Sequence, residues 1–235
     1  MADIKQQVVL ITGAKGGLGS VITRACLEAG ATVAGSSRSI VDADFPNPHF
    51  AAVPADLSDP AAATHLAGTV IESLGRIDSL IHVAGGFAGG KPLHETDEAT
   101  WDGMMNLNAR AAFHVLRAVI PHMRKAGTGR IVAIGSRAGV QPAANISAYS
   151  ASKAALVSLV QTVALENKDA GITANVILPG TIDTEANRRF DSTAGGGTWI
   201  APERLAALAL FLISDAAAQI TGAGIPMYGR ENPSA

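Results

Sequence analysis

The sequence predicts an α/β protein in which one doubly wound parallel sheet of about seven strands carries helices on both faces. Two observations lead to this prediction: short β-branched runs alternate with longer helical stretches, and the short runs are apolar throughout. Such alternation indicates βαβ units, and continuously apolar runs indicate strands buried on both faces. No linker, repeat or low-complexity tract divides the chain, so we expect a single domain over residues 1–235.

The expected elements follow in chain order. The strands are predicted at Val8–Thr12, Thr32–Ser36, Phe50–Pro54, Ser79–Ala84, Arg130–Gly135, Thr173–Leu178 and Gly224–Met227. The helices are predicted at Gly17–Ala29, Pro60–Leu74, Trp101–Asn108, Ala109–Lys125, Ser147–Asp169 and Pro202–Ser214. A short substrate lid is expected at about residues 184–201. Open α/β sheets bind ligands at the carboxyl ends of their strands, so residues after each strand are the candidate site.

The composition excludes several classes of function. The chain is 48% hydrophobic and 16% charged with a net charge of −2, which argues against disorder and offers no basic surface for nucleic acid. The most apolar run, Leu205–Ile213, is too short to span a membrane. No signal segment is visible at the start, so a cytoplasmic location is expected. The single cysteine, Cys26, is expected to be a buried structural thiol.

A glycine-rich turn follows the first predicted strand. Thr12–Gly19 reads T-G-A-K-G-G-L-G, with Gly13, Gly17 and Gly19 at the key spacing and Gly16 and Leu18 between them. Glycines allow a sharp turn and a close backbone approach, and a helix N-terminus offers free N–H groups to a phosphate. The segment therefore predicts a dinucleotide site, although a purely structural turn is an alternative at this point.

The end of the second strand bears on which dinucleotide binds. A carboxylate often stands about 20 residues beyond the glycines to hold the ribose hydroxyls, but here Ser37 and Arg38 occupy that place. Together with Lys15, Arg38 suits a 2′-phosphate, so NADP is favoured and NAD stays possible. Asp42 and Asp44 are expected to come too late in the chain to reach the ribose. The alternative is that both cations are solvated.

A second group of residues suits proton transfer. Tyr149 and Lys153 are four positions apart on a predicted helix, so the phenol and the ammonium are neighbours. A fixed ammonium stabilises a phenolate and should lower its pKa, and such a phenol can donate or accept a proton. Ser136 follows a strand and could hold an oxygen where negative charge develops. Taken alone, the Tyr149 and Lys153 pair could also be an ordinary helix-surface pair.

Together these motifs resemble the short-chain dehydrogenase/reductase family, from about Val8 to about Gly229. The resemblance rests on Thr12–Gly19, the Asp56-Leu57 step, Asn108, the spacing from Ser136 to Tyr149, and Pro179-Gly180 followed by Thr184. It implies a Rossmann-type fold and hydride transfer between a nicotinamide cofactor and the carbonyl or alcohol carbon of a small molecule. A non-catalytic dinucleotide sensor is a competing hypothesis.

The resemblance also implies residue roles. Tyr149 would be the general acid and base, Lys153 would hold the nicotinamide ribose, Ser136 would orient the carbonyl, and Asn108 would hold a water that links Lys153 to solvent. The remaining cofactor contacts would come from the residues that follow the other strands, namely Asp56, Leu57, Ala84, Gly85, Gly86, Pro179, Gly180, Ile182 and Thr184.

The chain departs from the family pattern in places. His82-Val83-Ala84-Gly85 replaces the usual Asn-Asn-Ala-Gly, and His82 is expected to stabilise the strand. Residues 83–90 and 178–188 resemble dihydropteridine reductases, which makes a pterin reductase the runner-up. Those enzymes have an acid at the place of Ser37 and lack the serine found at Ser136.

Further expectations concern the surroundings of the site. Phe87 and Trp199 could stack on a flat substrate, and Arg188 and Arg189 could meet an anionic group or solvent. No metal is predicted. The helix Ser147–Asp169 carries more apolar side chains than one sheet face can bury, which predicts a homodimer or homotetramer. Whichever of its residues Leu156 and Val160 faces outward is the expected contact.

Overall fold

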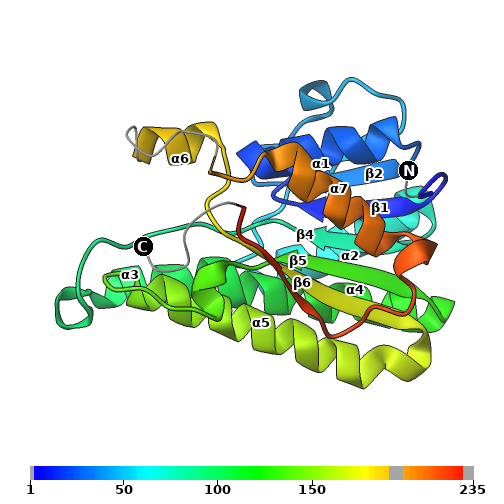
Figure 1. The fold of residues 1–235 in the computed structure, drawn as a ribbon. Helices are drawn as coiled ribbons and strands as arrows, with labels where there is room; N and C mark the ends of the chain where they lie inside the picture. Colours follow the sequence, from blue (N-terminus) through cyan, green and yellow to red (C-terminus); the bar gives the residue numbers. More distant parts are fainter. Residues whose placement is uncertain (1–2, 191–197, 230–235) are drawn as a thin grey trace.

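The computed structural model describes residues 3–190 and 198–229, and its fold is the predicted one (Figure 1). A single sheet of seven strands has the order β3-β2-β1-β4-β5-β6-β7. Every neighbouring pair is parallel. The strands are β1 (Val8–Thr12), β2 (Thr32–Ser36), β3 (Phe50–Ala52), β4 (Ser79–His82), β5 (Gly129–Ile134), β6 (Ile172–Pro179) and β7 (Gly224–Met227).

Two helical layers cover the sheet (Figure 1). One face carries α1 (Gly17–Glu28) and α7 (Pro202–Ile213). The other carries α2 (Pro60–Leu74), α4 (Ala111–Ala126) and α5 (Ser147–Asn167). Each layer encloses its own hydrophobic core, because successive side chains of a strand point to opposite faces. On β1, for example, Leu10 belongs to one core and Ile11 to the other.

Several predicted boundaries shift for local reasons. β3 stops at Ala52, before Pro54, whose nitrogen has no hydrogen to donate to a neighbouring strand. β4 stops at His82, opposite Thr12, because the glycine turn after β1 leaves Ala84 without a strand partner. β6 extends to Pro179, where it pairs with Met227.

The two helices predicted around Asn108 are joined by a π-helical segment. α3 (Glu98–Met104) runs directly into the segment η3 (Met105–Arg110) and then into α4. π turns are rare and often lie at functional sites. A short helix, α6 (Glu185–Phe190), forms within the expected lid and was not predicted. Residues 191–197 of that lid lie outside the described residues.

Helix α5 corrects one expectation. Leu156 and Val160 are both fully buried against the sheet, so neither is an outward contact. The outward positions are small or polar apart from Leu165, which is 72% exposed. The expected contact through Leu156 or Val160 was therefore wrong. Other large apolar side chains are exposed on the neighbouring elements α3, η3 and α4, namely Trp101, Leu107 and Phe113.

The order of the strands places the candidate site. β1 lies between β2 and β4, so the chain winds outward in both directions from it. At such a point the loops after two neighbouring strands part and leave a crevice.

None of the helices formed by the described residues is long and apolar enough to cross a membrane.

Candidate active site

The glycine turn after β1 is sterically fixed. Gly13 has φ +69°, and a Cβ on it would lie 2.8 Å from the backbone nitrogen of Ala84. A Cβ on Gly19 would lie only 2.0 Å from the carbonyl oxygen of Gly13. Both contacts exclude any side chain, so these glycines allow the turn to pack against α1 and against the loop after β4.

The N-terminus of α1 suits an anion. Its N-cap, Gly16, has no side chain to bond the first N–H groups of the helix. Gly17 and Thr184 line a hollow of about 340 Å³ beside this helix end, and a Cβ on Gly17 would lie 3.3 Å from the Thr184 side chain. Glycines that leave room beside unpaired N–H groups fit the pyrophosphate of a dinucleotide. Leu18, which follows, is buried in the core.

The segment that follows β2 contacts the glycine turn at Lys15. The backbone N–H of Lys15 donates to Ser37 Oγ at 3.2 Å, which joins the glycine turn to the end of β2. Arg38 next to it is exposed. The Lys15 ammonium lies 2.8 Å from Asp44 Oδ1. The turn at residues 42–44 thus folds back toward the glycine turn, and Asp44 contacts its lysine.

Asp56 and Leu57 follow β3. Asp56 accepts hydrogen bonds from the backbone N–H of Ser58 at 3.0 Å and from its hydroxyl at 2.8 Å. These bonds, and then the charge of Arg38, hold the pKa of Asp56 below its ordinary value. Leu57 is buried, and its carbonyl lies 2.9 Å from His114 Nδ1. The Asp56 carboxylate is therefore ionised and fixed at the edge where an adenine would lie.

Tyr149 lies in the first turn of α5. Its phenol interacts with Ser136, which follows β5. The Phe87 ring meets the Tyr149 ring edge-on, with centroids 5.0 Å apart. Burial raises the pKa of Tyr149, and the interaction with Ser136 offsets part of this rise. The direction is opposite to the expected lowering, so the phenol keeps its proton at neutral pH.

Lys153 lies one helical turn after Tyr149 and is only 5% exposed. Its ammonium donates to the carbonyl of Ile134, the last residue of β5, at 3.0 Å. Burial lowers the pKa of Lys153 to about 8. A Cβ on Gly85 would lie 3.4 Å from Lys153 Nζ, so the loop after β4 passes directly beside the ammonium.

Asn108 connects that loop to α5. Its side chain accepts from the N–H of Gly86 at 3.0 Å, and it donates to the carbonyl of Gly86 at 3.1 Å and to Ser152 Oγ at 3.0 Å. Ser152 in turn donates to the carbonyl of Tyr149 at 2.8 Å. Ser152 was not predicted as a site residue, although it directly precedes Lys153 in the sequence. The π-helical turn brings the buried Asn108 amide to this junction.

His82 is buried, as expected for a residue that stabilises the strand. Its Nδ1 lies 2.9 Å from the hydroxyl of Thr12 on the neighbouring strand β1. Burial, and then the charge of Lys153, lower the pKa of His82 to about 3, so the ring is neutral. It ties the end of β4 to the start of the glycine turn.

The loop after β6 is held by backbone contacts. It begins at Pro179, and the N–H of Gly180 donates to the carbonyl of Met227 at 3.0 Å. Ile182 forms a parallel bridge with Ile200, next to the half-buried Trp199. Two arginines of the lid have carboxylate partners of their own, Arg188 with Asp183 and Arg189 with Glu185. These pairs weaken the idea that either arginine waits for an anionic substrate.

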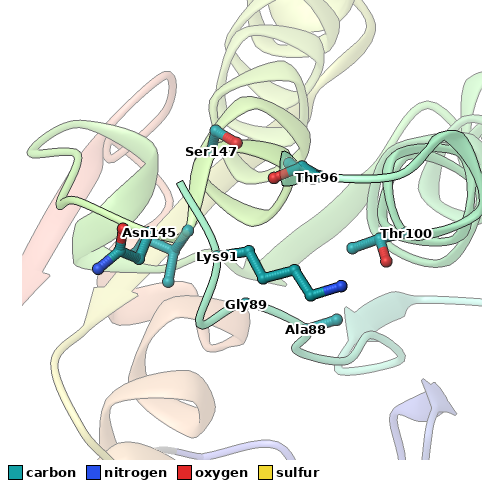
Figure 2. Close-up of a pocket in the computed structure, with 9 residues that line it drawn as sticks. Ala88, Gly89, Lys91, Thr96, Thr100, Asn145 and Ser147 are labelled. Carbon is teal, nitrogen blue, oxygen red and sulfur yellow. The ribbon is translucent and has the colours of Figure 1, made fainter. Parts of the chain in front are cut away.

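A small cavity of about 90 Å³ borders the start of α5 (Figure 2). It lies between the loop after β4, which contributes Gly89 and Lys91, and the residues Ser147 and Ala148 that lead into Tyr149. In Figure 2 the Lys91 side chain extends toward Thr100 of α3. Within residues 3–190 and 198–229, no group of three or more His, Cys, Asp or Glu could hold a metal ion.

Comparison with known proteins identifies the family. A family model described as short chain dehydrogenase matches residues 7–195. The chain belongs to this family. It is a nicotinamide-dependent oxidoreductase, in agreement with its glycine turn and its parallel sheet.

Individual relatives align with almost the whole length of this short-chain dehydrogenase. A short chain dehydrogenase of Penicillium brasilianum is 33% identical and covers 97% of this chain and 96% of its own length. A D-beta-hydroxybutyrate dehydrogenase of Rhizobium meliloti is 31% identical, with 95% and 97% covered. The crystal structure of a levodione reductase superposes with a TM-score of 0.89 at 26% identity, with 98% and 99% covered.

Proposed function

We propose that this enzyme interconverts a small carbonyl compound and its alcohol, with Tyr149 as the general acid and base. The observation that carries the proposal is the half-buried Tyr149 side chain, which interacts with the buried Ser136 and lies one helical turn from the buried Lys153. All three lie at the same edge of the sheet as the glycine turn. When bound, the nicotinamide would supply or accept the hydride.

Each side chain has a role that its surroundings support. The Ser136 hydroxyl would hold the substrate oxygen where charge develops. Tyr149, whose pKa is raised, would donate its proton to that oxygen during reduction. The Lys153 ammonium, with a pKa of about 8, is charged at neutral pH and would stabilise the phenolate that remains. Asn108 would hold the loop at Gly86 in place against α5, and it would bind the water of the proton relay.

The cofactor would lie along the carboxyl ends of the strands. The glycine turn and the N-terminus of α1 would hold the pyrophosphate, and Ser37, Arg38 and Asp56 would meet the adenosine. The nicotinamide half would lie against the residues after β4 and β6, namely Ala84, Gly85, Gly86, Pro179, Gly180, Ile182 and Thr184.

A substrate panel tests the proposal. Loss or gain of reduced-cofactor absorbance would be followed with ketones, quinones, acyl thioesters, quinonoid pterin and secondary alcohols. The names of two relatives, a dehydrogenase and a reductase, support testing both directions. Turnover of quinonoid pterin alone would select the runner-up. Tight cofactor binding without turnover of any compound would favour the non-catalytic sensor.

We expect NADPH to be preferred over NADH, and we expect Arg38→Asp to reverse the preference. The exposed Arg38 guanidinium can meet a 2′-phosphate, whereas an aspartate there repels it. The substitution should shift the ratio of kcat/KM values by about 1–3 kcal/mol, the range of a hydrogen bond between charged groups. Lys125→Asp, at the opposite edge of the sheet, makes the same charge change and should leave the ratio unaltered. A tenfold preference of the wild type for NADH would contradict the assignment.

We also propose a homodimer or homotetramer in the cytoplasm, built on the outer face of α4 and α5. Phe113 is 45% exposed and Leu165 is 72% exposed on this face. Phe113→Glu should produce monomers in light scattering at micromolar concentration, because a carboxylate cannot be solvated in a dry contact. Phe211→Glu, on α7 at the other face, serves as the comparison: a reduced mass there as well would indicate a tetramer. A wild type that is monomeric and fully active would overturn the proposal.

A further inference from the structure

Lys15, the lysine predicted to bind the cofactor phosphate, already has a carboxylate as its partner. The Lys15 ammonium lies 2.8 Å from Asp44 Oδ1 and donates to the carbonyl of Ser39 at 3.1 Å. Two partners on the segment after β2 therefore hold this side chain. Lys15 crosses from the glycine turn to that segment, although its side chain stays 42% exposed.

Asp44 is itself held in place. Its Oδ2 accepts from the N–H of Val41 at 2.9 Å, which closes the short turn Asp42–Asp44. The turn is tied to β3, because Asp42 Oδ1 accepts from the N–H of Ala52 at 2.7 Å. The hydrogen bond from Lys15, followed by the one from Val41, keeps the pKa of Asp44 below its ordinary value. The carboxylate is thus ionised and fixed beside the ammonium.

Arg38 differs from Lys15. Both side chains are exposed, but Arg38 acts on the Asp56 carboxylate only through its charge, which lowers the pKa of Asp56 less than the Ser58 hydrogen bonds do. Among the described residues, the ion pair in direct contact at this end of the site is that of Lys15 with Asp44. A 2′-phosphate can engage Arg38 directly, but it has to compete with Asp44 for Lys15.

We propose that Asp44 determines cofactor selectivity: by holding Lys15, it restrains the preference for a 2′-phosphorylated dinucleotide. The inference rests on the proposed cofactor site. Arg38 then provides the discriminating contact in the wild type, and Lys15 contributes its charge only when Asp44 releases it. A carboxylate within hydrogen-bonding distance cancels most of the field that an ammonium exerts on a second anion.

Calorimetric titration of the full chain with 2′,5′-ADP and with 5′-AMP tests this directly, because these probes differ only by the 2′-phosphate. Asp44→Asn keeps the shape and removes the charge, and it should raise the ratio of the two affinities by about 3- to 10-fold, somewhat more than an exposed ion pair is usually worth. Lys15→Met should lower the ratio by less than about threefold in the wild type, yet it should abolish the gain in the Asp44→Asn background.

Asp42→Asn is the matched control, since it removes a carboxylate from the same turn that does not contact Lys15. It should leave the ratio unchanged. An equal gain from Asp42→Asn, or an unchanged or lower ratio for Asp44→Asn, would overturn the role of Asp44. A large loss of the ratio for Lys15→Met alone would do the same without relying on the Asp44 variant. These outcomes are distinct from failure of the proposed function, which the substrate panel measures, and from failure of the proposed cofactor site, in which the wild type would bind neither NADPH nor NADH.

Discussion

Replacing Tyr149 by Phe is expected to lower turnover by about 10²- to 10⁴-fold, the range that general acid–base catalysis contributes. In the proposed mechanism the phenol oxygen exchanges a proton with the substrate, and Phe lacks this atom. The ring itself remains, so its edge contact with Phe87 is kept. Cofactor affinity should therefore stay nearly the same. The measurements are the turnover rate with the best substrate of the panel and a fluorescence titration with NADPH.

The chain offers a matched control, because its other tyrosine is Tyr228. Tyr228→Phe removes the same atom beside Arg137, whose guanidinium lies 5.5 Å from the ring centroid. This variant should keep full activity. Wild-type turnover by Tyr149→Phe would remove the basis of the assignment, and equal losses in both variants would point to a general structural effect.

Lys153→Met is expected to abolish activity and to stabilise the fold at neutral pH. The pKa of Lys153 is about 8 in the folded protein against an ordinary value of 10.5. The unfolded chain thus binds more protons between these values, so the free energy of unfolding rises with pH over that window and the full cost of burying the charge is present below pH 8. That cost is about 3 kcal/mol at 1.36 kcal/mol per pKa unit.

The variant also loses the hydrogen bond to the Ile134 carbonyl, which offsets part of the gain. A net stabilisation of about 1–3 kcal/mol at pH 7 is expected, and it should shrink by pH 9.5. Urea unfolding at both pH values measures it. Lys168→Met, an exposed lysine just after α5, should show neither effect. If Lys153→Met is no more stable than the wild type at pH 7, the buried charge does not carry the cost inferred here.

The sheet could be predicted from sequence because its strands are short, apolar and separated by helices. Val8–Thr12 is buried at every position, and such a run has few other structures available. The π turn at Asn108 could not be read in this way, because one extra residue per turn hardly changes the pattern of apolar positions. The short helix α6 lacks the length that makes a helical period visible.

The candidate site was predictable where local spacing determines it. Tyr149 and Lys153 share a helix, so their proximity follows from four positions of sequence. The contact of Lys15 with Asp44 depends instead on the path of the loop after β2, which no periodicity encodes. Likewise, the junction of Asn108 with Gly86 and Ser152 joins three separate elements. Asn108 was predicted as a site residue only through the family resemblance.

The place of β1 between β2 and β4 makes the glycine turn depend on a long-range event in folding. The Thr12 hydroxyl meets His82, 70 positions further along the chain, and Gly13 packs against Ala84. Two parallel strands cannot be joined by a tight hairpin turn. Pairing β1 with β4 therefore closes a long loop, and this costs chain entropy before any contact compensates for it. The glycine turn therefore reaches its final shape only when β4 has docked beside β1. A chain emerging from the ribosome should not bind the nucleotide before that point.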